Sequence, residues 1–90
     1  MNGLSIHITG IVQGVGFRPF VYNLAQRHHL TGWVRNLPDG RVAAVFEGNR
    51  EQLKAMLAWC RQGPPYAHVD EVVEDWQPYQ GEFADFTIRY

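Results

Sequence analysis

Two segments of the chain each carry one apolar stripe at helical spacing. Of all the features of the sequence, this one limits the possible folds most. The first stripe consists of Phe20, Val21, Leu24, Ala25 and His28. The second follows the i, i+3, i+4, i+7 pattern and consists of Leu53, Met56, Leu57 and Cys60. A helix with one apolar stripe has to bury it against another element. We therefore expect both helices to cover the same face of one sheet.

Segments with the period of a strand flank these two helices. Apolar and polar residues alternate over residues 4–9, and further strand patterns cover 33–37, 41–47, 69–76 and 86–90. The turn between the second and third strands is Pro38-Asp39-Gly40, in which Pro fixes φ and Gly accepts a positive φ. The order β-α-β-β-α-β, with a last strand segment at the end, predicts a single domain over residues 1–90. Its expected class is α+β, a ferredoxin-like sandwich with a mostly antiparallel sheet.

Local signals predict where the helices begin and end. Pro19 suits the first helical position, and Gly32 is expected to mark the exit after a helix end near His29-Leu30. Asn49 with Gln52 three residues later resembles a variant capping box for the second helix. Gly63-Pro64-Pro65 is expected to stop that helix.

Composition excludes several classes of protein. The net charge of −1 argues against a general nucleic-acid binder, and nothing approaches the roughly 18 apolar residues of a membrane span. The single Cys60 allows no internal disulfide and no cysteine-cluster metal site. We see no signal peptide, and we expect a cytoplasmic monomer. The charge is uneven, because residues 1–63 hold every Lys and Arg except Arg89 but few of the acidic residues.

The loop from Gln13 to Arg18 is the most informative segment for function. Its glycines, Gly14 and Gly16, allow successive backbone N–H groups to converge at the start of a helix, where the helix dipole adds positive charge. Arg18 adds a planar guanidinium that matches a phosphate. The loop predicts a cradle for one small dianion, although such glycine-rich turns are about as often purely structural. It lacks the Gly-Lys-Ser/Thr of a Walker loop and the third glycine of a dinucleotide fingerprint.

The stretch Gly10–Arg18 resembles the phosphate-binding signature of the acylphosphatase family, and Gly32–Asn36 resembles its second motif at the expected separation. Asp39-Gly40, Gly63-Pro64-Pro65 and the closing Phe86–Tyr90 are also similar to that family. The resemblance implies hydrolysis of acyl phosphates to a carboxylate and phosphate, without a cofactor. It implies that the catalytic arginine is Arg18 and the catalytic asparagine Asn36. The implied phosphate-binding residues are Gln13, Gly14, Val15, Gly16, Phe17 and Arg18.

The chemistry of these residue types agrees with such a reaction. The leaving carboxylate has a conjugate acid with a pKa of about 4, so it departs without a general acid. Positioning and electrostatics then do most of the work in the loose transition state. The amide of Asn36 cannot act as a base, but it can orient the attacking water. With no plausible general base in either motif, we expect a phosphate oxygen of the substrate to accept the proton.

Two alternatives remain open. The run Arg18-Pro19-Phe20-Val21-Tyr22 resembles the N-terminal module of the hydrogenase-maturation carbamoyltransferase, which handles carbamoyl phosphate. The length of the chain favours a free-standing enzyme, while Pro19 leaves open which acyl group is preferred. A non-catalytic anion-binding domain would need only the cradle. An RNA reader is disfavoured, because residues 41–46 do not show several aromatic residues within a basic context. A metallochaperone is disfavoured, because it needs paired cysteines and Cys60 is alone.

The remaining candidate side chains have simpler interpretations. Trp33 and Phe20 are expected in the core, and Cys60 is expected to be an inert buried thiol. The histidines are expected at the surface or in ordinary packing, and Ser5 has no base and orienter for a nucleophilic role. The acidic residues Asp70, Glu71, Glu74 and Asp75 predict a solvated strand edge.

Overall fold

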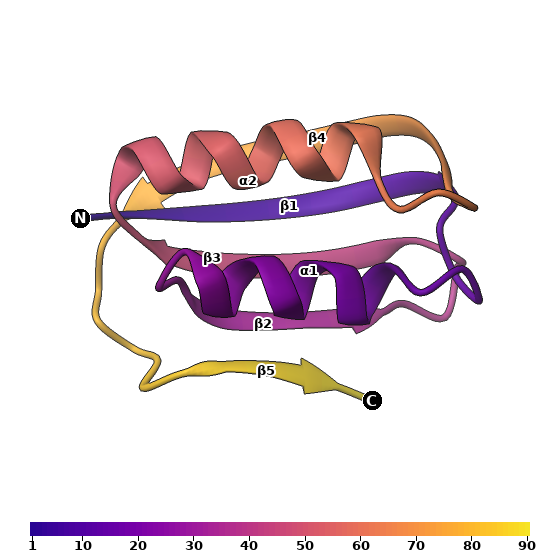
Figure 1. Cartoon of the computed structure of the whole chain (residues 1–90). Coiled ribbons are helices and arrows are strands. Elements are labelled where there is room, and N and C mark those ends of the chain that lie inside the picture. The colour runs from indigo at the N-terminus through magenta and orange to yellow at the C-terminus, as the bar shows by residue number, and fades with distance from the viewer.

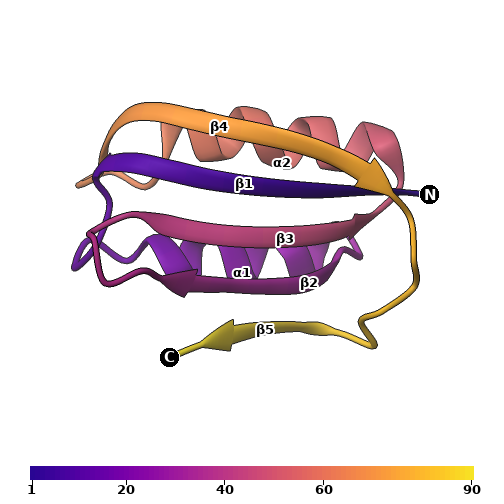
Figure 2. The same ribbon diagram turned by 180° about the vertical axis from the view of Figure 1, so that it is seen from behind.

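The computed structural model describes all 90 residues as one sheet with two helices on the same face (Figures 1 and 2). In chain order the elements are β1 (Asn2–Ile11), α1 (Phe17–Arg27), β2 (Thr31–Asn36), β3 (Val42–Gly48), α2 (Arg50–Gln62), β4 (His68–Pro78) and β5 (Phe86–Arg89). The strand order across the sheet is β4-β1-β3-β2-β5. The predicted ferredoxin-like sandwich and the predicted order of elements are confirmed.

The last strand gives the sheet its one parallel pairing. Neighbouring strands among β4, β1, β3 and β2 are antiparallel, whereas β5 runs parallel to β2. Because β4 and β5 form opposite edges of the sheet, the chain between them crosses one end of it (Figure 2). Of the two edge strands, β4 carries the expected row of exposed acidic side chains.

No helix of the structure is long and apolar enough to cross a membrane.

The core lies between the helices and the covered face of the sheet. Both predicted stripes contribute to it, and the largest fully buried side chains are Phe17, Phe46, Leu4, Ile6, Ile8, Leu53 and Met56. Trp33 does not belong to this core, contrary to the prediction, and is only half-buried. Its neighbours in β2, Gly32 and Val34, are buried. Since successive residues of a strand face opposite sides, Trp33 lies on the face that no helix covers.

Two of the predicted boundary signals play other roles in the structure. Helix α1 begins at Phe17 after the N-cap Gly16, so Pro19 is its third residue and not its first. A proline fits there because the first turn has no intrahelical acceptor for its N–H. The exit from α1 is made by His29 with φ 57°, not by Gly32. Gly32 lies inside β2 with φ 133°, where a Cβ atom would clash with the carbonyl oxygen of Val45.

The signals at the second helix agree better with the structure. Asn49 is the N-cap of α2, and its Oδ1 accepts the backbone N–H of Glu51 at 2.9 Å. The reciprocal hydrogen bond of a capping box, between the side chain of Gln52 and the backbone N–H of Asn49, does not form. Only one of the two hydrogen bonds of the predicted capping box is therefore present. Gly63 ends the helix, and its own N–H donates to the carbonyl of Trp59.

Candidate active site

The loop between β1 and α1 owes its path to two glycines in the left-handed region. Gly14 has φ 73° and Gly16 has φ 80°. A Cβ atom added at either position would meet nothing within 4 Å. The glycines are therefore needed for the backbone conformation itself and not for close packing, because other residues rarely adopt a positive φ.

This conformation leaves a series of backbone amides without acceptors. None of the N–H groups of residues 13–16 donates a hydrogen bond within the protein. The next two amides, of Phe17 and Arg18, belong to the first turn of α1, where N–H groups have no intrahelical partner. No side chain caps this helix, and its first turn holds no acidic residue. The free amides and the helix dipole together favour binding of an anion.

Gln13 ties this loop to the turn between β2 and β3. Its Nε2 donates to the carbonyl oxygen of Leu37 at 2.8 Å and to that of Arg41 at 2.9 Å. Both hydrogens of its amide group are thus used, so only the main chain of Gln13 is free to contact an anion. The side chain has a structural role that the sequence pattern does not indicate: it holds the loop beside Leu37, the residue after Asn36.

The β2–β3 turn is itself held by its own residues. The Asp39 carboxylate accepts the backbone N–H of Arg41 at 3.1 Å and its Nε at 2.8 Å. These bonds, from the backbone and then the side chain of Arg41, lower the pKa of Asp39 below its usual value. The predicted Pro38-Asp39-Gly40 turn is confirmed, and it presents the carbonyl groups that Gln13 binds.

Arg18 extends from the first turn of α1 and stacks on the ring of Tyr90. Its Cζ lies 4.9 Å from the ring centroid. Arg18 forms no ion pair with any carboxylate of the chain. Its guanidinium therefore keeps its charge and its N–H donors available for an anion. The alternation of Phe86, Ile88 and Tyr90 predicts a strand, but nothing in the sequence connects Tyr90 with Arg18.

Asn36 is the last residue of β2 and lies beside the loop. It pairs with Val42 across the β2–β3 register and is half-buried. Its side-chain amide makes no hydrogen bond within the protein. The amide is free to donate to and accept from a water molecule. The Gln13–Leu37 bond thus brings the two sequence motifs to one end of the sheet.

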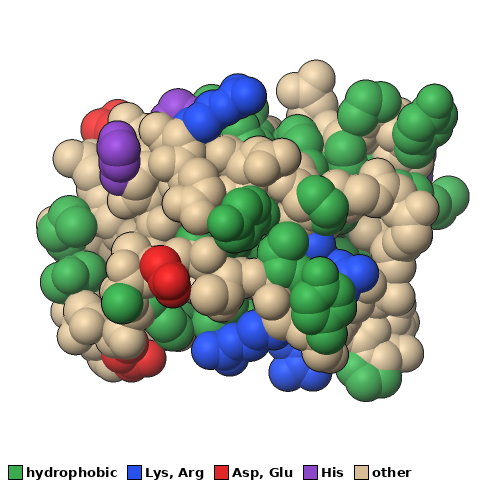
Figure 3. Space-filling view, turned by 60° about the horizontal axis from the view of Figure 1, so that its bottom comes forward, with side chains coloured by type: hydrophobic (Ala, Val, Ile, Leu, Met, Phe, Trp, Pro, Cys, Tyr) green, Lys and Arg blue, Asp and Glu red, His purple; other side chains and the backbone are tan.

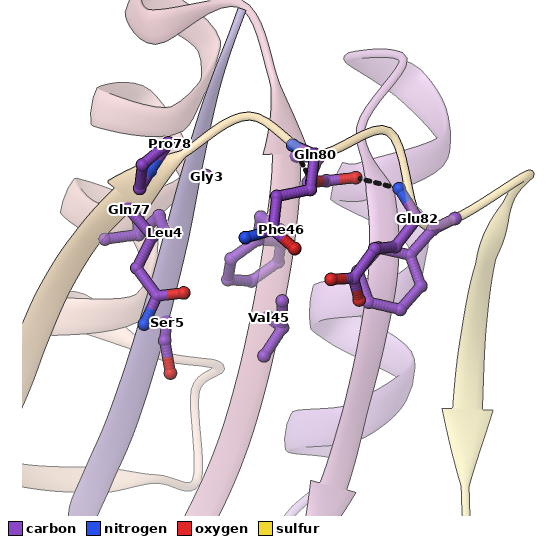
Figure 4. Close-up of a pocket in the computed structure, with 11 residues that line it drawn as sticks. Gly3, Leu4, Ser5, Val45, Phe46, Gln77, Pro78, Gln80 and Glu82 are labelled. Carbon is purple, nitrogen blue, oxygen red and sulfur yellow. Dashed lines mark hydrogen bonds between the residues drawn. The ribbon is translucent and has the colours of Figure 1, made fainter.

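A buried carboxylate at the other end of β3 also supports this arrangement. Glu47 is only 5% exposed, and its oxygens accept the N–H groups of Gln80, Gly81 and Glu82 at 2.9, 3.2 and 3.0 Å. Figure 4 shows this segment crossing the end of β3, above a small hollow between β1 and β3. These bonds fix the crossover from β4 to β5, the strand that leads to Tyr90. The strand pattern around Glu47 in the sequence gives no sign that its charge is buried.

The other candidate side chains lie away from this site. Cys60 is buried in α2, and this burial raises the pKa of its thiol to about 12, which makes it a poor nucleophile. His28 packs against the ring of Trp59, and His68 pairs with Asp70 at 3.1 Å. No group of three or more His, Cys, Asp or Glu side chains is placed to hold a metal ion.

The chain is similar in sequence and in structure to known acylphosphatases. A sequence model of the acylphosphatase family matches residues 4–88. The acylphosphatase of Syntrophus aciditrophicus is 48% identical over 90 residues, which cover 100% of this chain and 94% of that protein. The crystal structure of acylphosphatase from Bacillus subtilis has a TM-score of 0.96 at 34% identity, with both chains covered completely. HypF from T. kodakarensis has a TM-score of 0.84 at 40% identity, over 100% of this chain but only 12% of HypF. The match over nearly its whole length shows that the chain belongs to the acylphosphatase family.

Proposed function

We propose that this chain hydrolyses acyl phosphates to a carboxylate and inorganic phosphate. In this proposal the loop amides and Arg18 hold the phosphate, and Asn36 orients the attacking water. The observation that carries it is the set of unpaired amides in residues 13–18 beside an arginine without a carboxylate partner. The relatives named acylphosphatase support the same reaction class.

The cradle stabilises the negative charge of the phosphoryl group. The amides of residues 14–18 converge on one anion, and the main chain of Gln13 can add a further donor. Arg18 adds a full positive charge with a fork of N–H donors. In the loose transition state, charge spreads over the three phosphoryl oxygens and onto the leaving carboxylate. Donors fixed in advance stabilise this charge without reorganising, which lowers the barrier.

Asn36 acts on the water and not on the phosphate. Its amide can accept one hydrogen of the water and so direct the lone pair of the oxygen at phosphorus. A new P–O bond forms as the bond between phosphorus and the acyl oxygen breaks, and the carboxylate leaves with that electron pair. A phosphoryl oxygen of the substrate takes the proton that the water loses. Every step uses backbone amides and side chains that the chain itself provides.

A second candidate is the hydrolysis of carbamoyl phosphate by a module of a larger protein. The structural likeness to a small part of HypF and the run Arg18-Pro19-Phe20 favour it. Pro19 has no N–H group, and it follows the donors of the cradle. The same cradle therefore serves both candidates, and the difference between them lies in the acyl group. For either candidate we propose a cytoplasmic monomer that acts on a small molecule and binds no nucleic acid.

The proposal is tested by assaying the purified chain with benzoyl phosphate and carbamoyl phosphate. Arg18→Ala is expected to lower kcat/KM by about 100-fold or more, since loss of one preorganised donor has effects of this size. Arg27→Ala is the matched control, because Arg27 lies in the last turn of the same helix. The absence of turnover with both substrates in a folded sample would contradict the enzyme proposal. The ratio of the two activities decides between the candidates.

A further inference from the structure

Two arginines lie side by side on the sheet face that the helices leave open. In the parallel β2–β5 register, Arg35 is directly opposite Arg89. The guanidinium of Arg89 stacks on the indole of Trp33, with its Cζ 4.8 Å from the ring centroid. Because residues two apart in a strand share a face, Arg35 projects on the same side as Trp33. Figure 2 views the sheet from this uncovered side.

The charges of these two arginines are not compensated within the protein. The ion pairs of the structure involve Arg41, Lys54, Arg61 and His68, and none involves Arg35 or Arg89. In Figure 3, which brings the β5 side forward, basic side chains lie below the centre, to the right of it and at the top, while acidic ones lie on the left. Like charges directly opposite in a sheet destabilise it, so an anion bound between them would relieve this repulsion.

Both arginines directly adjoin residues of the candidate active site. Asn36 follows Arg35 in the chain, and Tyr90, which holds Arg18, follows Arg89. Successive strand residues face opposite sides, so Arg35 projects on the face of the sheet opposite to Asn36, and Arg89 is its partner at the end of β5. An acyl group that reaches them from the cradle has to pass around the ends of β2 and β5.

We propose that Arg35 and Arg89 form a second anion subsite, which selects acyl phosphates whose acyl group carries its own carboxylate or phosphate. The inference rests on the proposed hydrolysis, and it concerns the choice of substrate. The planar guanidinium forks match a carboxylate or a phosphate, and the indole of Trp33 holds one of them in place. This subsite binds the tail of the substrate and takes no part in the cleavage of the P–O bond.

The test compares two substrates of nearly the same size that differ in charge. These are 4-carboxybenzoyl phosphate and the neutral 4-carbamoylbenzoyl phosphate. The ratio of their kcat/KM values is measured for the wild type and for the Arg35→Gln/Arg89→Gln double variant. In the double variant this ratio is expected to be about fivefold to tenfold lower than in the wild type, because KM for the carboxylate substrate rises. Loss of two partly exposed ion pairs has an effect of this size. High salt is expected to reduce the wild-type ratio in the same direction.

The chain offers a closely matched control. Arg50 also stacks on a tryptophan, with its Cζ 4.7 Å from the centroid of Trp76, but it lies at the start of α2, at the opposite end of the sheet. Arg50→Gln is expected to leave the ratio unchanged. An equal ratio in the wild type and the double variant would overturn the subsite.

Binding of uncleavable analogues separates failure of the subsite from failure of the proposed function. Calorimetric titration with 4-carboxybenzoylphosphonate and 4-carbamoylbenzoylphosphonate requires no turnover. The carboxylate analogue is expected to bind more tightly to the wild type and to lose this advantage in the double variant. If neither phosphate substrate is hydrolysed, the proposed function fails. If both proteins bind the two analogues equally, the subsite fails.

Discussion

The aromatic ring of Tyr90 stacks on the guanidinium of Arg18, and the Cζ of Arg18 lies 4.9 Å from the ring centroid. This contact restrains the side chain of Arg18 without neutralising it, since the ring carries no net charge. A carboxylate in the same place would hold the arginine more strongly but would compete with a phosphate. The contact also joins the end of the sheet to the first turn of α1, so the position of β5 bears on the candidate active site.

Tyr90→Ala is expected to raise KM for benzoyl phosphate about twofold to fivefold, with a smaller effect on kcat. The ring contact is exposed to solvent, where such contacts contribute about 0.5–1 kcal/mol. Tyr90→Phe keeps the ring and is expected to behave as the wild type. Steady-state kinetics of both variants check the prediction, and equal effects of Ala and Phe would rule out a role for stacking.

Asn36→Ala is expected to lower kcat by about 100-fold or more, because the attacking water loses its orienting group. The affinity for inorganic phosphate, measured as a competitive inhibitor or by calorimetry, is expected to stay nearly the same. This split between turnover and binding follows from assigning Asn36 to the water and Arg18 to the phosphate. If phosphate affinity fell as much as turnover, Asn36 would belong to the cradle instead.

Glu47→Gln is expected to destabilise the fold by about 2 kcal/mol, because one carboxylate oxygen becomes an NH₂ group that faces backbone donors. The affected donors are the N–H groups of Gln80, Gly81 and Glu82. Urea unfolding measures the loss, and hydrogen exchange is expected to be faster in residues 80–89. Glu51→Gln is a suitable control, since the side chain of Glu51 is 80% exposed. Equal stabilities of the two variants would show that the three bonds contribute little.

Alkaline pH is expected to weaken the fold through Cys60. Burial raises the pKa of its thiol from 9.0 to about 12, so the unfolded chain releases this proton at a lower pH than the folded one. The stabilising contribution is complete below pH 9 and is lost as the pH rises toward 12. Urea unfolding at pH 8 and pH 10 is expected to show a loss about 1 kcal/mol larger in the wild type than in Cys60→Ala. Identical losses would mean that Cys60 ionises equally in both states.

Patterns that act over short stretches of chain were sufficient to predict the architecture and the path of the loop before α1. The apolar stripe ending in Cys60 predicted the buried face of α2, since burial follows helical spacing. Gly14 and Gly16 predicted the path of the loop, because a positive φ is a local property of the backbone. The assignment of Arg18 and Asn36 came from their motifs, and it remains a proposal.

Contacts between distant segments depended on the tertiary structure alone. Trp33 was expected in the core, but alternation along a strand does not tell which face the helices cover. The bond from Gln13 to Leu37 and the stacking of Tyr90 on Arg18 join segments that only the folded sheet brings together. The sequence alone determined the order of the elements and the conformation of the glycine loop. Only the tertiary structure decided how the loop, Asn36 and the end of β5 meet, because strand order and register place them there.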